Sequence, residues 1–341
     1  MLELRFPPPH LTDDRYRADV RQIIAEVLET QRQRGNRAGN QAIIDKIGLE
    51  ARFVQGEGYW GEALDYHLGL LHAHIGEPEK AAYHFDRSGT RPSDGGDQVF
   101  SDHQRASLEL RRLQDLAKQR GIPSLLIASM PRSASASLTQ TLAAMLDAPL
   151  MRVSCGQIPS YYLVPRWLNC FSHGGAVLHD HFGAVPFNLK TLREGGCRKV
   201  FVRVRDPRPA AASMANLINR RFGAPAHIDY ESQAIQLCEQ YFIPWIADWF
   251  AAAGDAGTGL QIHWLAQPSS AIAEMARDVL TALAPEYPAL EQYLGKAVAE
   301  VKANYVTGDK EVWRKEISKS GQERLWQAVP PNVKDFLGLQ P

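Results

Sequence analysis

The chain lacks several features that would place it at a membrane or on nucleic acid. Its most apolar stretch, residues 241–253, is too short to span a bilayer and contains Pro244 and Asp248. Its start has a proline triplet and no apolar core, so we expect no secretory signal there. Lys and Arg number 38, as do Asp and Glu, so no excess of positive charge favours an anionic partner. We therefore expect no nucleic-acid partner and no membrane span.

Cysteine is also scarce, and its spacing argues against two common kinds of site. None of the cysteines forms a Cys-x-x-Cys pair, which disfavours a zinc site or a disulfide framework. Isolated thiols are typical of a reduced compartment, and we expect a cytoplasmic protein. The cysteines are Cys155, Cys170, Cys197 and Cys238.

Two familiar phosphate-binding motifs are missing as well, the Walker A loop and the Gly-x-Gly-x-x-Gly turn. In their place, the apolar run 124–129 leads into a segment of small residues, 130–138, which contains Arg132 and precedes a helical pattern. Small residues let backbone N–H groups approach an anion, and a helix N-terminus and a guanidinium add positive charge. The pattern predicts an anion-binding loop, with a plain strand–helix turn as the alternative.

The predicted elements change character near residue 120. Every clear pattern before that point is helical, including segments at 78–87 and 101–120. After it, short β-type runs alternate with helices, which predicts an α/β fold with a mostly parallel sheet covered on both faces. We therefore divide the chain into a helical region, 1–120, and an α/β domain, 121–341. The domain's predicted strands are 125–129, 176–179, 199–204 and 260–265, and its predicted helices are 137–147, 207–222, 233–253 and 269–284.

Part of the helical region resembles a tetratricopeptide repeat (TPR). Asp65 and His72 replace the usual tryptophan and tyrosine of that repeat. A single repeat cannot bury its own apolar face. The resemblance implies an all-α, TPR-like region that packs on neighbouring helices, binds a protein partner or associates with a second copy. The residues at the positions where the two helices of such a repeat touch are Leu68, Gly69, Ala81 and Phe85.

A second charged turn follows the predicted strand 199–204. Arg205, Asp206 and Pro207 stand at its end, and Ser213 lies eight residues after the arginine, on the predicted helix. In the simplest interpretation Arg205 and Asp206 form a local ion pair. An arginine beside a helix start also suits phosphate, because its planar fork matches phosphate oxygens.

The two segments together resemble the PAPS-dependent sulfotransferases. Residues 131–137 resemble the family's 5′-phosphosulfate loop, and Arg205-Asp206-Pro207 with Ser213 resembles its 3′-phosphate motif. Ala134 stands where most members have glycine, a departure that the 2-O-sulfotransferases share. The resemblance implies a P-loop-like three-layer fold, PAPS as co-substrate, and a 3′-phosphate bound by Arg205 and Ser213. It also implies a set of loop residues around the 5′-phosphosulfate: Arg132, Ser133, Ala134, Ser135, Ala136 and Ser137.

A third segment, 305–314, resembles the late Gly-x-x-x-x-Trp-Arg/Lys stretch that folds over the nucleotide in many members of that family. An ordinary charged loop before a helix is the alternative. The further nucleotide contacts that the resemblance implies are Lys302, Thr307, Gly308 and Lys310.

Two histidines near the end of the predicted strand 176–179 are candidates for acid–base chemistry. In a strand His179 and His181 point to one face, with Asp180 on the other. The 2-O-sulfotransferases carry a similar His-x-His whose second histidine is the base. The resemblance implies that His181 is the base, that His179 orients it or binds substrate, and that Arg132 stabilises the leaving group. Two packed histidines, or a carboxylate base at Asp180 or Glu194, are the alternatives. A metal needs a third ligand, and we expect none.

We therefore predict a sulfotransferase that moves a sulfuryl group from PAPS to a hydroxyl of a sugar, a tyrosyl group or a small alcohol. It would require no metal or redox cofactor. The runner-up is an inactive adaptor that binds PAPS or PAP and acts through its helical region. Ala134 and Ala136 favour the adaptor, because they replace usual glycine or donor positions. The missing Walker lysine disfavours a kinase-like phosphotransferase.

Overall fold

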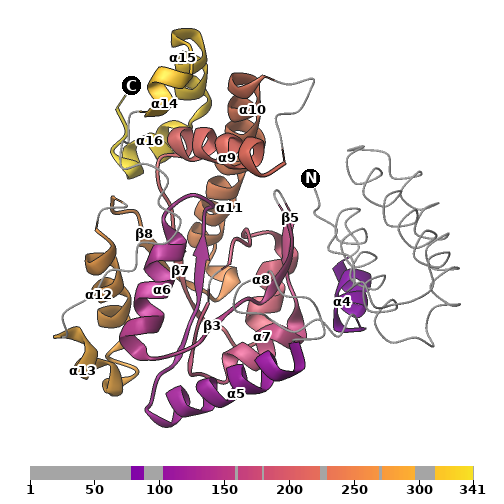
Figure 1. Ribbon diagram of the computed structural model, residues 1–341, viewed down its shortest axis with the longest axis vertical. Coiled ribbons are helices and arrows are strands. Elements are labelled where there is room, and N and C mark those ends of the chain that lie inside the picture. Colours follow the sequence, from indigo (N-terminus) through magenta and orange to yellow (C-terminus); the bar gives the residue numbers. More distant parts are fainter. Residues whose placement is uncertain are drawn as a thin grey trace, which may run out of the picture. The chain divides into compact units, whose positions relative to one another are not determined.

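A computed structural model describes residues 78–87, 103–157, 160–178, 180–222, 229–268, 271–295 and 312–340. The chain divides into two compact units (Figure 1). Unit 1 comprises Met1–Arg112 and Arg152–Cys170, and unit 2 comprises Leu113–Met151 and Phe171–Pro341. The predicted division at residue 120 stays a prediction, because most of the segment before it lies outside the described residues.

Unit 2 is built on parallel strands. In one group β1 and β3 both pair with β6, and in the other β2 and β8 both pair with β7. A parallel bridge between Ala128 and Asp180 joins the two groups, giving the order β3-β6-β1/β2-β7-β8. This arrangement confirms the predicted parallel sheet. The strands are β1 Ser124–Leu125, β2 Ile127–Ser129, β3 Leu150–Met151, β6 Ala176–Leu178, β7 Lys199–Arg203 and β8 Gln261–Leu265.

The strand order creates a switch point between β2 and β7. After β2 the chain leads to β3 at one edge, whereas after β7 it leads to β8 at the other edge. Ligands of open parallel sheets bind outside the carboxyl ends of the strands at such a point. The loop after β2 and the turn after β7, both singled out in the sequence, meet there.

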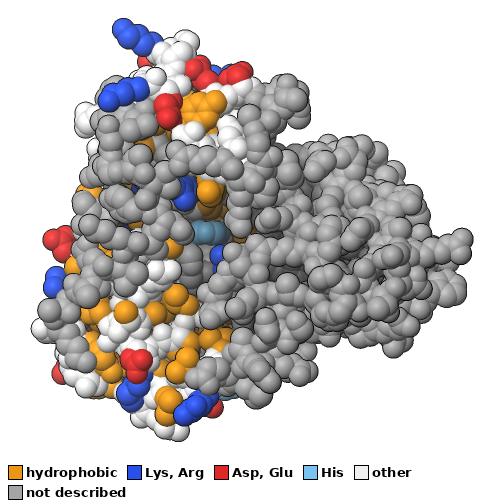
Figure 2. Space-filling view, viewed as in Figure 1, with side chains coloured by type: hydrophobic (Ala, Val, Ile, Leu, Met, Phe, Trp, Pro, Cys, Tyr) orange, Lys and Arg blue, Asp and Glu red, His pale blue; other side chains and the backbone are white. Residues whose placement is uncertain are grey.

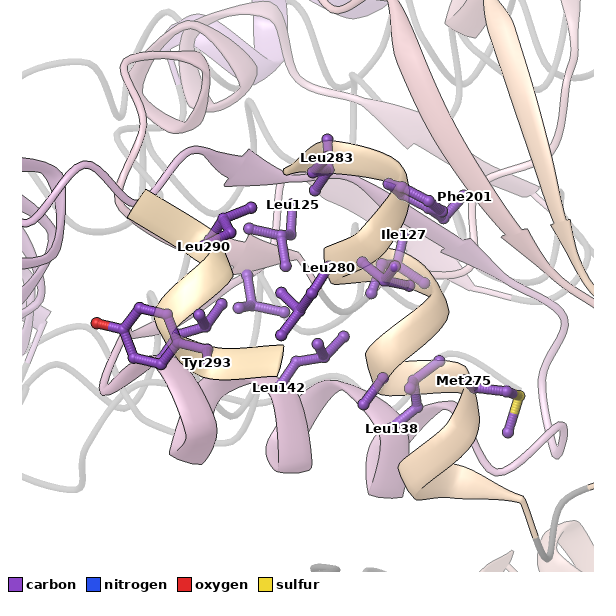
Figure 3. Close-up of a cluster of buried hydrophobic side chains, with 14 of the residues drawn as sticks. Leu125, Ile127, Leu138, Leu142, Phe201, Met275, Leu280, Leu283, Leu290 and Tyr293 are labelled. Carbon is purple, nitrogen blue, oxygen red and sulfur yellow. The ribbon is translucent and has the colours of Figure 1, made fainter. Parts of the chain in front are cut away.

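Helices α6 (Ser135–Leu146) and α12 (Ile272–Leu283) cover one face of the sheet with apolar side chains. Figure 3 shows Leu138 and Leu142 of α6 meeting Leu280 of α12, with Leu125 from the strands beside them. The α6 leucines are four residues apart, so they lie on one helix face. Burial of each such side chain contributes about 1.5–3 kcal/mol. This core fixes the start of α6 against the end of β2.

The predicted helix 233–253 is helical in the structure, but the helix is interrupted. A π-helical turn, Cys238–Phe242, separates α10 (Tyr230–Leu237) from α11 (Ile243–Gly254). Pro244 explains the interruption, because its ring clashes with the carbonyl four residues earlier in a regular α-helix.

Figure 1 shows α9, α10 and the C-terminal helices gathered at one end of unit 2. Its other elements are α8 Pro186–Glu194, α9 Pro207–Phe222, α13 Glu291–Leu294, α14 Val312–Glu316, α15 Lys319–Ala328, α16 Pro331–Leu337 and the 3-10 turns Ala256–Thr258 and Pro288–Leu290.

The described part of unit 1 contains a helix and a hairpin. Helix α4 spans Pro78–Arg87, as the sequence predicted, and Pro78 suits the first turn because its missing N–H has no helical acceptor there. Strands β4 (Ser154–Gln157) and β5 (Ser160–Leu163) pair antiparallel, which the sequence reasoning missed. The rest of the TPR-like resemblance lies outside the described residues. Two helices cross the unit boundaries, α5 His103–Gln119 and α7 Pro165–Ser172.

Candidate functional site

The loop between β2 and α6 holds two residues in the left-handed conformation. Arg132 has φ 62° and Ala134 has φ 63°. This conformation costs an L-residue about 1–2 kcal/mol, whereas glycine adopts it without that cost. Ala134 is also the N-cap of α6 and accordingly offers no side-chain cap. The loop thus places an alanine in a backbone geometry that favours glycine.

Two arginines from β7 and the turn after it hold carbonyl groups of this loop. Arg203 Nε donates to Ser133 O at 2.9 Å, and Arg205 Nη1 donates to Arg132 O at 3.0 Å. With successive carbonyls held in this way, the loop is tied to the switch point of the sheet. Helix α6 then begins at Ser135, and its first-turn N–H groups have no acceptor within the helix.

The serine side chains of the loop and of the first turn of α6 are all buried. Ser133 is fully buried, and within the described part of the chain its Oγ has no hydrogen-bond partner. Ser135 and Ser137 are buried in the first turn of α6, while Ala136 between them is half-buried. The first turn contains no acidic residue, so the positive end of the helix dipole is not neutralised there. The arrangement suits an anion.

The turn after β7 is stabilised by side-chain hydrogen bonds. Asp206 accepts from the Arg208 backbone N–H at 3.0 Å, and both its carboxylate oxygens accept from the Arg208 guanidinium. The ion pair in this turn is therefore Asp206–Arg208, whereas the simplest interpretation of the sequence paired Asp206 with Arg205. Arg205 Nη1 reaches the first loop instead.

One contact joins the first loop to helix α9. Arg132 Nε donates to Ser213 Oγ at 2.9 Å, although the two residues are 81 positions apart in the sequence. The structure therefore brings together Arg132, Arg205 and Ser213, three of the residues that the sequence reasoning selected. In Figure 2 a histidine and basic side chains are visible side by side near the middle of the face shown.

The hydrogen bonds of His181 define its neutral tautomer. Its Nδ1 lies 2.8 Å from Ser129 O and 3.1 Å from Ser129 Oγ. The carbonyl can only accept, and the hydroxyl already donates to Asp180 O at 2.8 Å. Nδ1 must therefore carry the hydrogen, which leaves the lone pair on Nε2. Trp245 Nε1 donates to His181 O at 3.1 Å and holds the backbone of this segment. The half-buried imidazole thus presents a basic nitrogen.

The two carboxylates considered as alternative bases are placed less favourably. Asp180 is only 4% exposed, and its Oδ1 accepts from the His181 N–H at 3.0 Å. Glu194 is exposed at the end of α8, just before β7 begins. Because the strands are parallel, it lies at the end of the sheet opposite to His181.

Several predicted site residues cannot be placed. His179, Lys302, Thr307, Gly308 and Lys310 lie outside the described residues. Among the residues that are described, no cluster of three His, Cys, Asp or Glu side chains could hold a metal ion. No helix in that same part of the chain is long and apolar enough to cross a membrane.

Sequence reasoning missed Arg203. It is fully buried at the end of β7, directly below the loop. Burial, with a smaller contribution from nearby Arg205, lowers the pKa of its guanidinium to about 9, so it stays charged at neutral pH. An arginine in the otherwise apolar run Val200–Val204 was the signal that could have found it.

Comparison with solved structures finds several similar chains. No protein-family model matches the chain, and no curated protein matches it. Among solved structures, mouse sulfotransferase SULT7A1 complexed with PAP is similar over 68% of this chain and 92% of that chain, at 12% sequence identity and a TM-score of 0.41.

Proposed function

We propose that this chain is a PAPS-dependent sulfotransferase with a P-loop-like nucleotide site. The observation that carries the proposal is the Arg132–Ser213 contact, which joins the loop after β2 to the helix after β7. Arg205 contacts the same loop through Arg132 O. A nucleotide with phosphate groups at both its 5′ and 3′ positions would meet the first loop with one and Arg205 and Ser213 with the other. Lys302, Thr307, Gly308 and Lys310 are further proposed contacts.

Buried donors in unit 2 support an anionic ligand. Ser133 Oγ and Arg203 Nη2 are both buried and, among the described residues, have no hydrogen-bond partner. Leaving such a group unsatisfied costs about 1–3 kcal/mol. An anion offers only acceptors, and the loop and its surroundings offer hydroxyl, guanidinium and helix N–H donors. The donor set fits a phosphosulfate.

The proposed transfer needs a base and a charge stabiliser. PAPS, when bound, supplies a sulfuryl group whose bridging oxygen leaves with the nucleotide. His181 Nε2 takes the proton of the acceptor hydroxyl as that oxygen bonds to sulfur. Arg132 stabilises the negative charge that grows on the departing bridging oxygen. Ser129 and Trp245 keep the imidazole and its backbone in place. The proposed products are a sulfate ester and adenosine 3′,5′-bisphosphate (PAP).

The proposal also covers the acceptor and the partners. We propose a hydroxyl-bearing acceptor, namely a glycan, a tyrosyl peptide or a small alcohol. The TPR-like region is proposed to bind a protein partner or a second copy of the chain. A cytoplasmic location stays a prediction.

The proposal is tested by transfer of labelled sulfate from PAPS. The full-length protein would be incubated with labelled PAPS and with separate pools of glycans, tyrosyl peptides and small alcohols. Label in one acceptor pool, dependent on intact protein, is the expected result. Tight PAP binding with no label in any pool would favour the adaptor, a function that the strained Ala134 also supports. ATP binding tighter than PAP binding would contradict both.

A further inference from the structure

Arg203 stands out among the charged side chains of unit 2 because it is fully buried and bonded to backbone carbonyls. Its Nε donates to Ser133 O at 2.9 Å. Its Nη1 donates to Val204 O, Leu265 O and Gln267 O at 2.9, 2.8 and 2.7 Å. One guanidinium thus ties the loop after β2 to the ends of β7 and β8. A buried charge of this kind is costly unless a nearby group compensates it.

The Arg203 contact fixes the direction of one loop peptide. A trans peptide is planar, with its C=O and N–H on opposite sides. The Ser133 carbonyl accepts from Arg203, so the N–H of Ala134 points away from Arg203, on the opposite side of the peptide. Ala134 holds this orientation in a left-handed conformation, which a loop without an anchor would relax.

We propose that Arg203 is a positioning residue that turns the Ala134 N–H toward a bound anion by holding the Ser133 carbonyl inward. This inference rests on the proposed nucleotide site and deepens it. Arg203 acts on the loop that is proposed to bind the 5′ end of the nucleotide. Arg205 also holds that loop, through Arg132 O, but Arg205 and Ser213 are proposed to bind the 3′-phosphate. All the hydrogen-bond acceptors of the buried Arg203 guanidinium are backbone carbonyls, none of which carries a negative charge. A bound anion would therefore also stabilise this buried positive charge.

The test compares two ligands and three variants of the full chain. Adenosine 5′-monophosphate (AMP) uses only the loop, and PAP uses the loop and the 3′ contacts. The variants are Arg203→Lys, Arg203→Met and, as a matched control, Lys199→Met. Lys199 lies at the other end of β7 and donates to Ala282 O and Glu286. Lysine keeps the charge but cannot bridge the Ser133 carbonyl and the carbonyls of β8 at once. Calorimetry would give the affinities, and thermal unfolding would verify the folded state.

The expected result is a parallel loss of affinity for both ligands. Arg203→Lys should weaken AMP and PAP by about tenfold each, since one hydrogen bond to a charged group is lost, while Lys199→Met matches wild type. Arg203→Lys with wild-type affinity for both ligands overturns the proposal, and so does a loss confined to PAP. Lower thermal stability with unchanged affinity also overturns it.

A measurement on the unaltered protein makes the test independent of how the variants fold. The Ala134 amide should shift in the NMR spectrum and exchange its hydrogen more slowly when PAP or AMP binds. No change at Ala134 in the presence of bound nucleotide overturns the role of Arg203 alone. A wild-type protein that binds neither nucleotide overturns this role together with the proposed function.

Discussion

The two segments of unit 2 that we propose to bind an anion, the first and second anion contacts, are built from different parts of the chain. In the loop after β2, the backbone of Arg132 and Ala134 takes left-handed conformations and is held by arginines from a different strand and turn. The turn after β7 is instead stabilised by side chains, because the Arg208 guanidinium donates to the Asp206 carboxylate. The backbone of the first segment is strained, whereas the second contains a local ion pair between Asp206 and Arg208.

The second contact is also braced by the C-terminal helices. Arg208 is 2% exposed and lies over the rings of Trp313 and Trp326, at 5.5 and 4.9 Å from their centroids. Such cation–π contacts contribute about 0.5–2 kcal/mol each. Arg208 Nη2 also donates to Gln340 O at 2.8 Å. The start of α9, the helix that carries Ser213, is therefore held by contacts with residues near the C-terminus.

The largest effect is expected where neither anion contact is altered. His181→Ala should lower the rate of sulfuryl transfer by about 10²–10⁴-fold, because general base catalysis is lost, and should leave PAP affinity unchanged. Single-turnover transfer of labelled sulfate and PAP calorimetry measure the two quantities. His173→Ala is the matched control, since this exposed histidine precedes the amino end of β6. Equal rates in His181→Ala and wild type would show that another group is the base.

The next effect separates the two anion contacts. Arg205→Met should weaken PAP by about ten- to a hundredfold, because hydrogen bonds to charged groups contribute about 1.5–3 kcal/mol. AMP should lose less, since it has no 3′-phosphate and loses only the support that Arg205 gives the first loop through Arg132 O. Calorimetric titration of both ligands gives the ratio, with the exposed Arg193→Met as control. A loss that is the same for AMP and PAP would contradict the assignment of Arg205 to the 3′-phosphate.

A smaller effect is expected at Ser129. Ser129→Ala removes one of the two acceptors that hold Nδ1–H of His181 and keeps the backbone carbonyl. One hydrogen bond contributes about 1 kcal/mol, so the transfer rate should fall by about fivefold. PAP affinity should stay the same, which distinguishes this change from damage to the neighbouring loop. An unaltered transfer rate would indicate that the carbonyl alone fixes the tautomer.

The smallest effect tests the strain of the first contact. Ala134→Gly should stabilise the folded protein by about 1 kcal/mol, because relief of the left-handed strain outweighs the greater entropy of an unfolded glycine. Denaturant unfolding measures the change. Ala136→Gly, two residues further into α6, should instead destabilise by about 1 kcal/mol. If Ala134→Gly destabilises as well, the left-handed geometry of residue 134 is wrong.

The same contrast explains which parts of the site could be predicted from the sequence. The strand–loop–helix order around Arg132 and the placement of Ser213 after Arg205 depend on local patterns, and the structure has both. The tautomer of His181 depends on Ser129, 52 positions earlier, and the role of Arg203 depends on Ser133, 70 positions earlier. Such contacts exist only once the sheet has brought its strand ends together. They are therefore invisible to local periodicity.

The fold shows the same limit at two other places. Strands β4 and β5 lie in a segment without a clear alternating pattern, so their pairing was not predicted. The π-helical turn before Pro244 depends on how one ring displaces a carbonyl within a long helix, and the apolar pattern continues across it. Periodicity placed the helix correctly but could not reveal the interruption.

The most direct test of the account is a calorimetric titration of the wild-type protein with PAP and with AMP under identical salt. The two anion contacts together predict that PAP binds at least about tenfold more tightly than AMP, because Arg205 and Ser213 add charged hydrogen bonds to the 3′-phosphate. Equal affinities for the two nucleotides would contradict the central claim that both contacts serve one ligand.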